Sequence, residues 1–210
     1  MQLKNVSKLL RPLIRGGHAW QHITINGAEN KPYFFFTNTQ WFLLLLSCIV
    51  LFRLTKGISE EIIGYVMGAF SISVSLFMSL LISIFDKFEN TRFENEEKTE
   101  DEIIHLTQKK NFFKRFISIT SYLVVLSILV IVLCSFTYLF NLSVRIVLPE
   151  TLISDWKQID WVLTIKNTIL VTYRVTLNYF LLNYLLLTLF ITGSAYDYYI
   201  SEMERRKIAS

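Results

Sequence analysis

The chain has 210 residues, of which 52% are hydrophobic and 15% aromatic, and its formal net charge is +4. This hydrophobic share is too high for an ordinary soluble domain, and the apolar residues are grouped into blocks along the chain. The composition therefore predicts an integral membrane protein. In such a protein a small excess of Lys and Arg is an orientation signal, so the charge does not indicate direct binding of nucleic acid.

Residues 1–32 predict a basic amphipathic segment. At helical spacing, basic side chains share one side and apolar side chains another: Lys4, Lys8, Arg11 and Arg15 against Leu3, Val6, Leu10 and Leu13. Such a segment can lie on the anionic inner leaflet of a membrane, and the alternative is a plain flexible arm. Pro12 should break or kink the helix unless the helix begins there.

Four apolar runs follow, over residues 33–54, 62–85, 116–144 and 175–196. Spanning the hydrocarbon layer of roughly 30 Å takes about 20 apolar residues in a helix. Because lipid offers no hydrogen-bond partner to an open backbone, each run should be a helix. We therefore expect an all-α fold, an integral membrane four-helix bundle over residues 33–200. The first run is the weakest, because polar residues interrupt it at Thr37, Asn38, Thr39 and Gln40.

The second run carries small residues along one side. Projected as a helix, they fall within roughly one third of the circumference; they are Gly64, Gly68, Ser71, Ser75, Ser79 and Ser83. Small side chains let two helix backbones approach closely in lipid, so this small-residue stripe predicts a packing surface and self-association into a homo-oligomer. Serine hydroxyls on consecutive turns can instead line a hydrated path for ions, and the sequence leaves both interpretations open.

Residues 86–115 are the predicted cytoplasmic loop, which is acidic first and basic second. The Glu-rich stretch is expected to extend the second span into solvent as a polar helix, and the basic end to anchor the third span at the headgroups. A solvated connector explains this pattern. The alternative is a docking surface for a soluble protein, formed by acidic and apolar side chains together: Glu96, Glu97, Glu100, Glu102, Ile103, Ile104 and Leu106.

Residues 145–174 are the predicted outer segment, in which Pro149 suits a helix start and the apolar side chains that follow keep to one side. This pattern predicts a short amphipathic helix on the outer surface. Polar side chains in or beside the fourth run should face protein or water; they are Arg174, Asn178 and Asn183. Arg174 is expected to extend to the outer headgroups, and each Asn to find a partner across the bundle.

The distribution of Lys and Arg indicates the orientation, because short loops rich in these residues stay in the cytoplasm. The segment before the first run, the 86–115 loop and the basic 201–210 tail hold fifteen of the 21 Lys and Arg residues. We therefore expect both termini in the cytoplasm and a multi-pass protein of the cell inner membrane.

Motifs for catalysis are missing from the sequence: it contains no HExxH, no GxSxG and no phosphate-binding glycine loop. His18 and His22 would share a helix side and can hold a metal ion, but two ligands without an acidic third are more often an ordinary polar pair. Cys48 and Cys134 fall inside spans, where a free thiol is a small apolar filler. We expect no catalytic residue, no metal site, no cofactor and no enzyme activity.

The layout of four spans, both ends inside, a charged central loop and a helical outer segment resembles the small four-pass membrane proteins of bacterial antiphage defence loci, of which the Kiwa membrane subunit is one. The resemblance covers the whole chain in architecture and carries over no residue role. It implies a homo-oligomer in the inner membrane that works with a cytosolic effector protein.

Two functions remain open at this point. The leading expectation is a non-catalytic membrane sensor or anchor subunit, which recruits the effector through the 86–115 loop and the basic ends. The alternative is a small oligomeric pore that conducts ions and depolarises the membrane.

Overall fold

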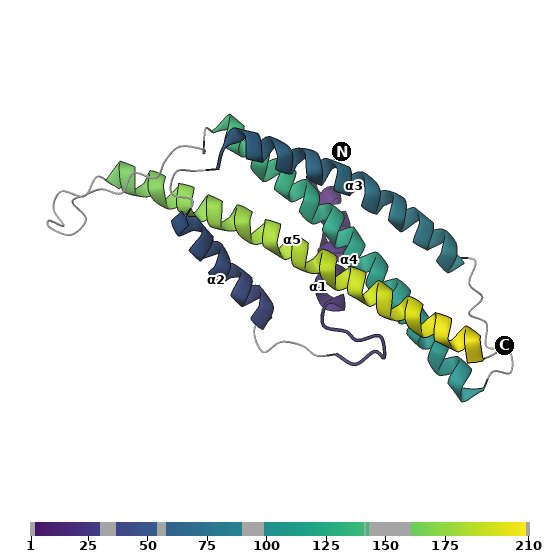
Figure 1. The fold of residues 1–210 in the computed structure, drawn as a ribbon. Coiled ribbons are helices and arrows are strands. Elements are labelled where there is room, and N and C mark those ends of the chain that lie inside the picture. Colours follow the sequence, from purple (N-terminus) through teal and green to yellow (C-terminus); the bar gives the residue numbers. More distant parts are fainter. Residues whose placement is uncertain are drawn as a thin grey trace. The chain divides into compact units, whose positions relative to one another are not determined.

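The structure is a computed structural model that describes residues 3–29, 37–53, 58–89, 99–140, 142 and 161–208. These residues contain five helices, which are α1 (Leu3–Trp20), α2 (Asn38–Arg53), α3 (Glu60–Glu89), α4 (Glu100–Leu139) and α5 (Trp161–Ile208) (Figure 1). Within the same residues there is no strand, and the single β-bridge joins Ile23 to Glu29. The expectation of an all-α protein is confirmed.

Three of the helices, α3, α4 and α5, are long and apolar enough to cross a membrane. With 40 and 48 residues, α4 and α5 are about 60 Å and about 72 Å long, roughly twice the thickness of the hydrocarbon layer. Both therefore extend beyond the predicted spans. Residues 100–115, expected within a loop, are the first turns of α4, and residues 161–174, expected within the outer segment, are the first turns of α5.

The helix α2 is shorter than the first predicted span, because the polar residues that interrupt the run form its N-terminus. The Thr37 Oγ1 accepts a hydrogen bond from the backbone N–H of Gln40, and the Gln40 Oε1 accepts one from the backbone N–H of Thr37, both at 3.1 Å. This capping box satisfies donors that the start of a helix leaves without partners. The 16 residues of α2 are about 24 Å long, less than a full crossing.

A side-chain cap also starts α4. The backbone N–H of Thr99 donates to the Glu102 Oε2 at 3.1 Å, as in a Thr-x-x-Glu capping box. The Glu-rich stretch is expected to extend the second span; α3 is described as far as Glu89, and Glu100, near the end of that stretch, begins α4. The residues 90–98 that separate the two helices, Glu96 and Glu97 included, lie outside the described residues.

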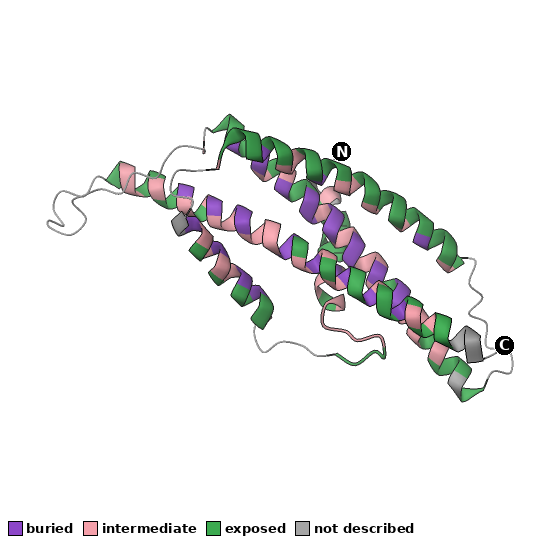
Figure 2. Ribbon diagram, viewed as in Figure 1, coloured by how far each residue is buried: buried purple, intermediate pink, exposed green. Residues whose placement is uncertain are grey.

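The chain forms two compact units. Unit 1 comprises the described parts of residues 1–35, 72–128 and 184–210, and unit 2 those of residues 36–71 and 129–183. Each unit buries one face of its helices and leaves other faces exposed (Figure 2).

Aromatic rings dominate the core of unit 1 at the end nearest Glu89. The rings of Phe112 and Tyr198 stack with centroids 4.0 Å apart and planes 8° apart. The rings of Phe88 and Phe113 meet edge to face at 5.5 Å. Because these side chains come from α3, α4 and α5, the cluster holds the three helices together there.

The core of unit 2 is mainly aliphatic. Its fully buried side chains include Ile63 from α3, Val130 and Cys134 from α4, and Leu177 from α5. The helix α2 adds a buried face with helical spacing that consists of Gln40, Leu43, Ser47 and Leu51.

The helix α1 continues through Pro12, where the sequence predicts a break or kink. Proline removes one backbone N–H and leaves the carbonyl of Lys8 without its helical donor. Pro12 is exposed, so water can bond to that carbonyl. We therefore attribute the tolerance of Pro12 to its place on a solvent-accessible part of the helix.

Candidate docking and packing surfaces

The residues of the small-residue stripe lie on one side of α3, as the sequence predicts. That side of the helix is exposed. All six of its residues are exposed. A Cβ atom added at Gly68 would meet nothing within 4 Å, and one added at Gly64 would meet only the Tyr138 hydroxyl, at 3.6 Å. The buried side chains of α3, Ile63, Phe70 and Ile84, lie on the opposite side of the helix. The close approach that the stripe allows is therefore not used within the described chain.

Two serine hydroxyls of the stripe bond to their own helix. The Ser71 Oγ donates to the Met67 carbonyl at 2.8 Å, and the Ser79 Oγ donates to the Ser75 carbonyl at 3.1 Å. A serine that bonds to the carbonyl four residues earlier needs no further partner for its hydrogen. These side chains can accordingly face lipid, another helix or water.

Arg174 is a buried member of unit 2 rather than a side chain that extends to headgroups. Only 1% of its surface is exposed, and its Nη2 donates to the carbonyl of Leu142 at 3.3 Å. Leu142 follows the last turn of α4, and its backbone N–H bonds to the carbonyl of Thr137 at 3.1 Å. A cation at a helix C-terminus satisfies terminal carbonyls and interacts favourably with the helix dipole. The expectation of snorkelling for Arg174 is thus replaced by a role in ending α4.

A pair of hydroxyls joins α4 to α5 at the residue that precedes Arg174. The Tyr173 hydroxyl lies 2.5 Å from the Thr137 Oγ1 and donates to the carbonyl of Leu133 at 2.5 Å. Sequence reasoning did not identify this contact, because Thr137 and Tyr173 are common residues in apolar helices and only their packing brings them together.

Asn178 and Asn183 are both buried in unit 2, yet the described residues do not supply all of their partners. The Asn178 Nδ2 and the Asn183 Oδ1 are buried without a hydrogen bond. Asn178 also lines an apolar cavity of about 150 Å³ together with Val66, Cys134 and Leu177. The predicted burial of both amides is observed, whereas the predicted partner across the bundle is absent for these two atoms.

The tip of α4, residues 100–106, exposes apolar side chains. Ile103 is 44% exposed and Ile104 is 56% exposed, whereas Leu106 is half-buried. Met203 on α5 is also exposed, and the His105 Nε2 lies 3.5 Å from the Glu202 Oε2, so the tip of α4 lies beside this part of α5. Among the predicted docking residues, Glu100 is exposed and Glu102 caps the helix.

The turn that follows α1 is attached to α4. The Gln108 Nε2 donates to the Asn26 Oδ1, and the Asn111 Nδ2 donates to the Ile25 carbonyl, both at 3.0 Å. Gly27 has φ of 84°, a backbone conformation that favours glycine and closes the turn. Within unit 1 these bonds fix the turn against the part of α4 that precedes the predicted third span.

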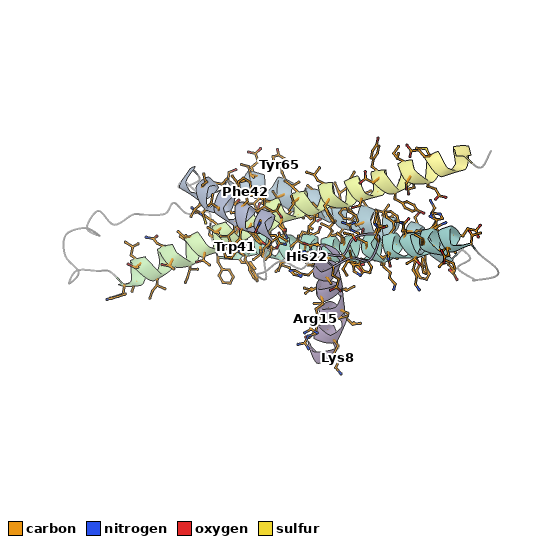
Figure 3. The ribbon with its side chains drawn as sticks, turned by 90° about the horizontal axis from the view of Figure 1, so that it is seen from below. Lys8, Arg15, His22, Trp41, Phe42 and Tyr65 are labelled. Carbon is orange, nitrogen blue, oxygen red and sulfur yellow. The ribbon has the colours of Figure 1, made fainter. Side chains whose placement is uncertain are left out.

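Glycines let the C-terminal end of α1 approach α4 closely. A Cβ at Gly17 would overlap the ring of Tyr122, and one at Gly16 would lie 3.9 Å from the Ser118 Cβ. By contrast, the earlier turns of α1 are exposed, and in Figure 3 Lys8 lies farther from α4 than Arg15 and His22. Among the described residues, unit 1 therefore contacts α1 at its C-terminal end.

His18 and His22 lie beside each other, with ring centroids 5.2 Å apart in an edge-to-face arrangement. Burial, and secondarily the charge of His18, lower the pKa of His22 below its usual value. A third ligand is not brought to this pair, and no group of three or more His, Cys, Asp and Glu side chains able to hold a metal ion occurs among the described residues.

These features define a helical protein with three candidate membrane-spanning helices, exposed apolar ends and one exposed stripe of small residues. No family model, no curated protein and no solved structure matches the chain.

Proposed function

We propose that the chain is a non-catalytic, oligomeric subunit of a cell inner membrane that anchors a cytosolic effector protein. The observation that carries this proposal is the tip of α4 beside α5, which places exposed Ile103, Ile104 and Met203 beyond the apolar stretch of both helices. Exposed apolar side chains next to charged ones are typical of a protein interface. A role in antiphage defence, in which such a subunit also acts as a sensor, follows from the resemblance in layout.

Substitutions at the tip of α4 test the anchoring role. Ile103→Ser together with Ile104→Ser should release a protein that co-purifies with the full chain from its native cells, because apolar area would be lost from the interface. Lys110→Ser is the control, since Lys110 is also exposed on α4 but lies outside the tip. Glu100→Lys adds a charge reversal that leaves the cap at Glu102 intact. Retention of the same protein by the double variant would refute the docking surface.

The orientation proposed is four crossings with both termini in the cytoplasm. It is supported by the Lys and Arg distribution, and it requires α2 to cross the membrane together with the apolar residues 33–36 that precede it. Reporter domains fused after residue 210 and within residues 54–57 should report the cytoplasm and the opposite side, respectively. A C-terminal reporter active only outside the cytoplasm would contradict this orientation.

We also propose that α1 lies on the anionic inner leaflet. Leu9, Leu10, Leu13 and Ile14 are exposed, and the basic side chains lie on the opposite side of the helix. In vesicles with phosphatidylglycerol, a Leu10→Cys variant should react more slowly with a water-soluble maleimide than in vesicles of phosphatidylcholine alone. Equal rates in both vesicles would argue for a free arm.

The exposed stripe on α3 also leaves room for the alternative function, an oligomeric pore. In that arrangement Ser71, Ser75 and Ser79 of several copies would surround a hydrated path. The bonds that Ser71 and Ser79 make within α3 give this alternative less support than the packing role. Replacing the three serines with Leu should abolish ion flux into liposomes if the chain is a pore, and should leave any flux unchanged if it is not.

A further inference from the structure

Unit 1 contains a polar cavity of about 440 Å³ that neither the docking surface nor the stripe uses. Three segments line it: the turn after α1, the first part of α4 and the last part of α5. The polar side chains in its lining include Thr24, Asn26, Gln108, Arg115, Asp197 and Ser201. The cavity lies near the start of the apolar run at Phe116, which is the depth at which a bilayer has its headgroups.

The walls of this cavity are held in place by hydrogen bonds. The bonds from Gln108 and Asn111 fix the turn to α4, and the Ser201 Oγ donates to the Tyr198 carbonyl at 2.8 Å. The stacked rings of Phe112 and Tyr198 hold α4 against α5 beside it. A ligand would thus meet a largely formed site, which lowers the entropy lost on binding.

Arg115 supplies a cation in this cavity. Arg115 is half-buried, and its guanidinium lies over the ring of Phe190, 4.4 Å from the centroid. A guanidinium binds phosphate through a planar fork of N–H groups. Arg115 is therefore suited to a phosphate group.

Asp197 supplies an anion on the α5 side of the same cavity. Within the residues that the structure describes, no ion pair joins Asp197 to Arg115, although both line the cavity. A cationic and an anionic side chain that do not pair with each other can bind a zwitterionic ligand, which carries one charge of each sign. A phosphate carries the negative charge such a ligand needs, and a primary ammonium group carries the positive charge and donates hydrogen bonds.

We propose that this cavity binds a phosphoethanolamine group, with the phosphate on Arg115 and the ammonium on Asp197. The group can come from the headgroup of phosphatidylethanolamine, which reaches the cavity from the surrounding bilayer, or from a free phosphoethanolamine in the cytosol. Both sources present the same two charges to the same two side chains.

Lipid retention by the full chain tests this proposal. The detergent-purified protein is incubated with equal parts phosphatidylethanolamine and phosphatidylglycerol, separated from free lipid, and its retained lipids are quantified. We expect phosphatidylethanolamine to be enriched. Arg115→Gln and Asp197→Asn should each lower its retention about tenfold, because each removes one charge-assisted contact. Lys114→Gln, at an exposed neighbouring position, should retain it unchanged.

A second arm identifies the source of the group. Free phosphoethanolamine is titrated into protein in lipid-free detergent by calorimetry. Binding of the lipid or of the free compound, with loss in both variants, supports the proposal and names the source. Absence of both, or a cavity in which Asp197→Asn strengthens retention of phosphatidylglycerol, would overturn it. If Arg115→Gln does not fold, the nearly isosteric Asp197→Asn variant decides alone.

Discussion

Buried polar side chains in unit 2 differ in how well the protein satisfies them. Arg174 bonds to a carbonyl at the end of α4, and Tyr173 bonds to Thr137 and Leu133. Asn178, in contrast, has a buried Nδ2 beside an apolar cavity, and none of the described residues bonds to it. An unsatisfied amide donor in a low-dielectric interior costs about 1–3 kcal/mol. Asn178 is therefore the residue where a substitution has the most to gain.

Asn178→Leu should raise the free energy of unfolding by about 1–3 kcal/mol, because it removes the unsatisfied amide and fills part of the cavity with apolar atoms. Titration with sodium dodecyl sulfate, followed by circular dichroism, measures the change. Leu177→Ala, at a fully buried neighbouring position, should lower the same free energy by about 2–5 kcal/mol. A destabilised Asn178→Leu variant would mean that the amide has a partner, for example on another copy of the chain.

The sequence predicted that Asn178 and Asn183 face away from lipid, and both are buried. Arg174 was expected at the outer headgroups and is buried as well. The sequence did not predict what each of them bonds. The position of a polar residue within an apolar run can be read from the sequence. Its hydrogen-bond partner depends on how two helices are rotated about their axes. The carbonyl that Arg174 reaches belongs to Leu142, which lies 32 positions earlier, and no local pattern identifies such a pair.

At the scale of helices, the polar residues at their starts decide the boundaries. Thr37 and Gln40 form a capping box, and Glu102 accepts a hydrogen bond from the backbone N–H of Thr99 as in one half of such a box. These patterns can be recognised in a sequence. Apolar length alone does not give these starts: the first apolar run begins at residue 33 whereas α2 begins at Asn38, and residues 100–115, expected within a loop, belong to α4. The extent of α4 and α5 beyond the apolar runs could not be inferred from hydropathy, because a polar helix in solvent looks like a connector.

The contact of α1 with α4 allows a direct test through a disulfide. A Cβ at Gly16 would lie 3.9 Å from the Ser118 Cβ, within the range of about 3.5–4.5 Å that disulfides need. Gly16→Cys with Ser118→Cys should therefore form an intramolecular cross-link in a background where Cys48 and Cys134 are replaced by Ala. Peptide mapping under non-reducing conditions detects the bond.

Adding Gly17→Leu to the cysteine pair tests whether the cross-link depends on the close approach of α1 to α4. The leucine would overlap the ring of Tyr122, so α1 should be displaced and the yield of the cross-link should fall several-fold. Adding Leu9→Ala, at an exposed position on α1, should leave the yield unchanged. A cross-link that survives Gly17→Leu would show that α1 is held by contacts other than these glycines.

At the scale of the whole molecule, the small-residue stripe on α3 is an exposed surface. Contact with lipid alone would not require small side chains there. Small residues expose backbone, and their use is understandable where another helix comes close. Since the opposite side of α3 already packs within the chain, a second copy is the partner we propose. The sequence identified each residue of the stripe. Its exposure could not be predicted, because exposure depends on where the other helices pack.

Cysteine cross-linking between copies tests self-association. Ser75→Cys should give a cross-linked dimer in membranes, whereas Leu80→Cys, exposed on another side of α3, should not. Gly68→Leu combined with Ser75→Cys should abolish the dimer, because the added side chain separates the two backbones. Open space at Gly68 means that this leucine fits a single chain. Equal cross-linking at both positions would indicate random collision.

The capping box at Thr37 has a consequence for the lipid around the protein. A helix that starts at Asn38 and is about 24 Å long is several ångströms short of an average hydrocarbon layer. In the four-crossing arrangement that we propose, the bilayer would have to become locally thinner around α2, or the flanking side chains would have to reach outward. Each ångström of mismatch costs a fraction of a kcal/mol. The fixed start of one short helix would thus make the protein prefer membranes with shorter acyl chains.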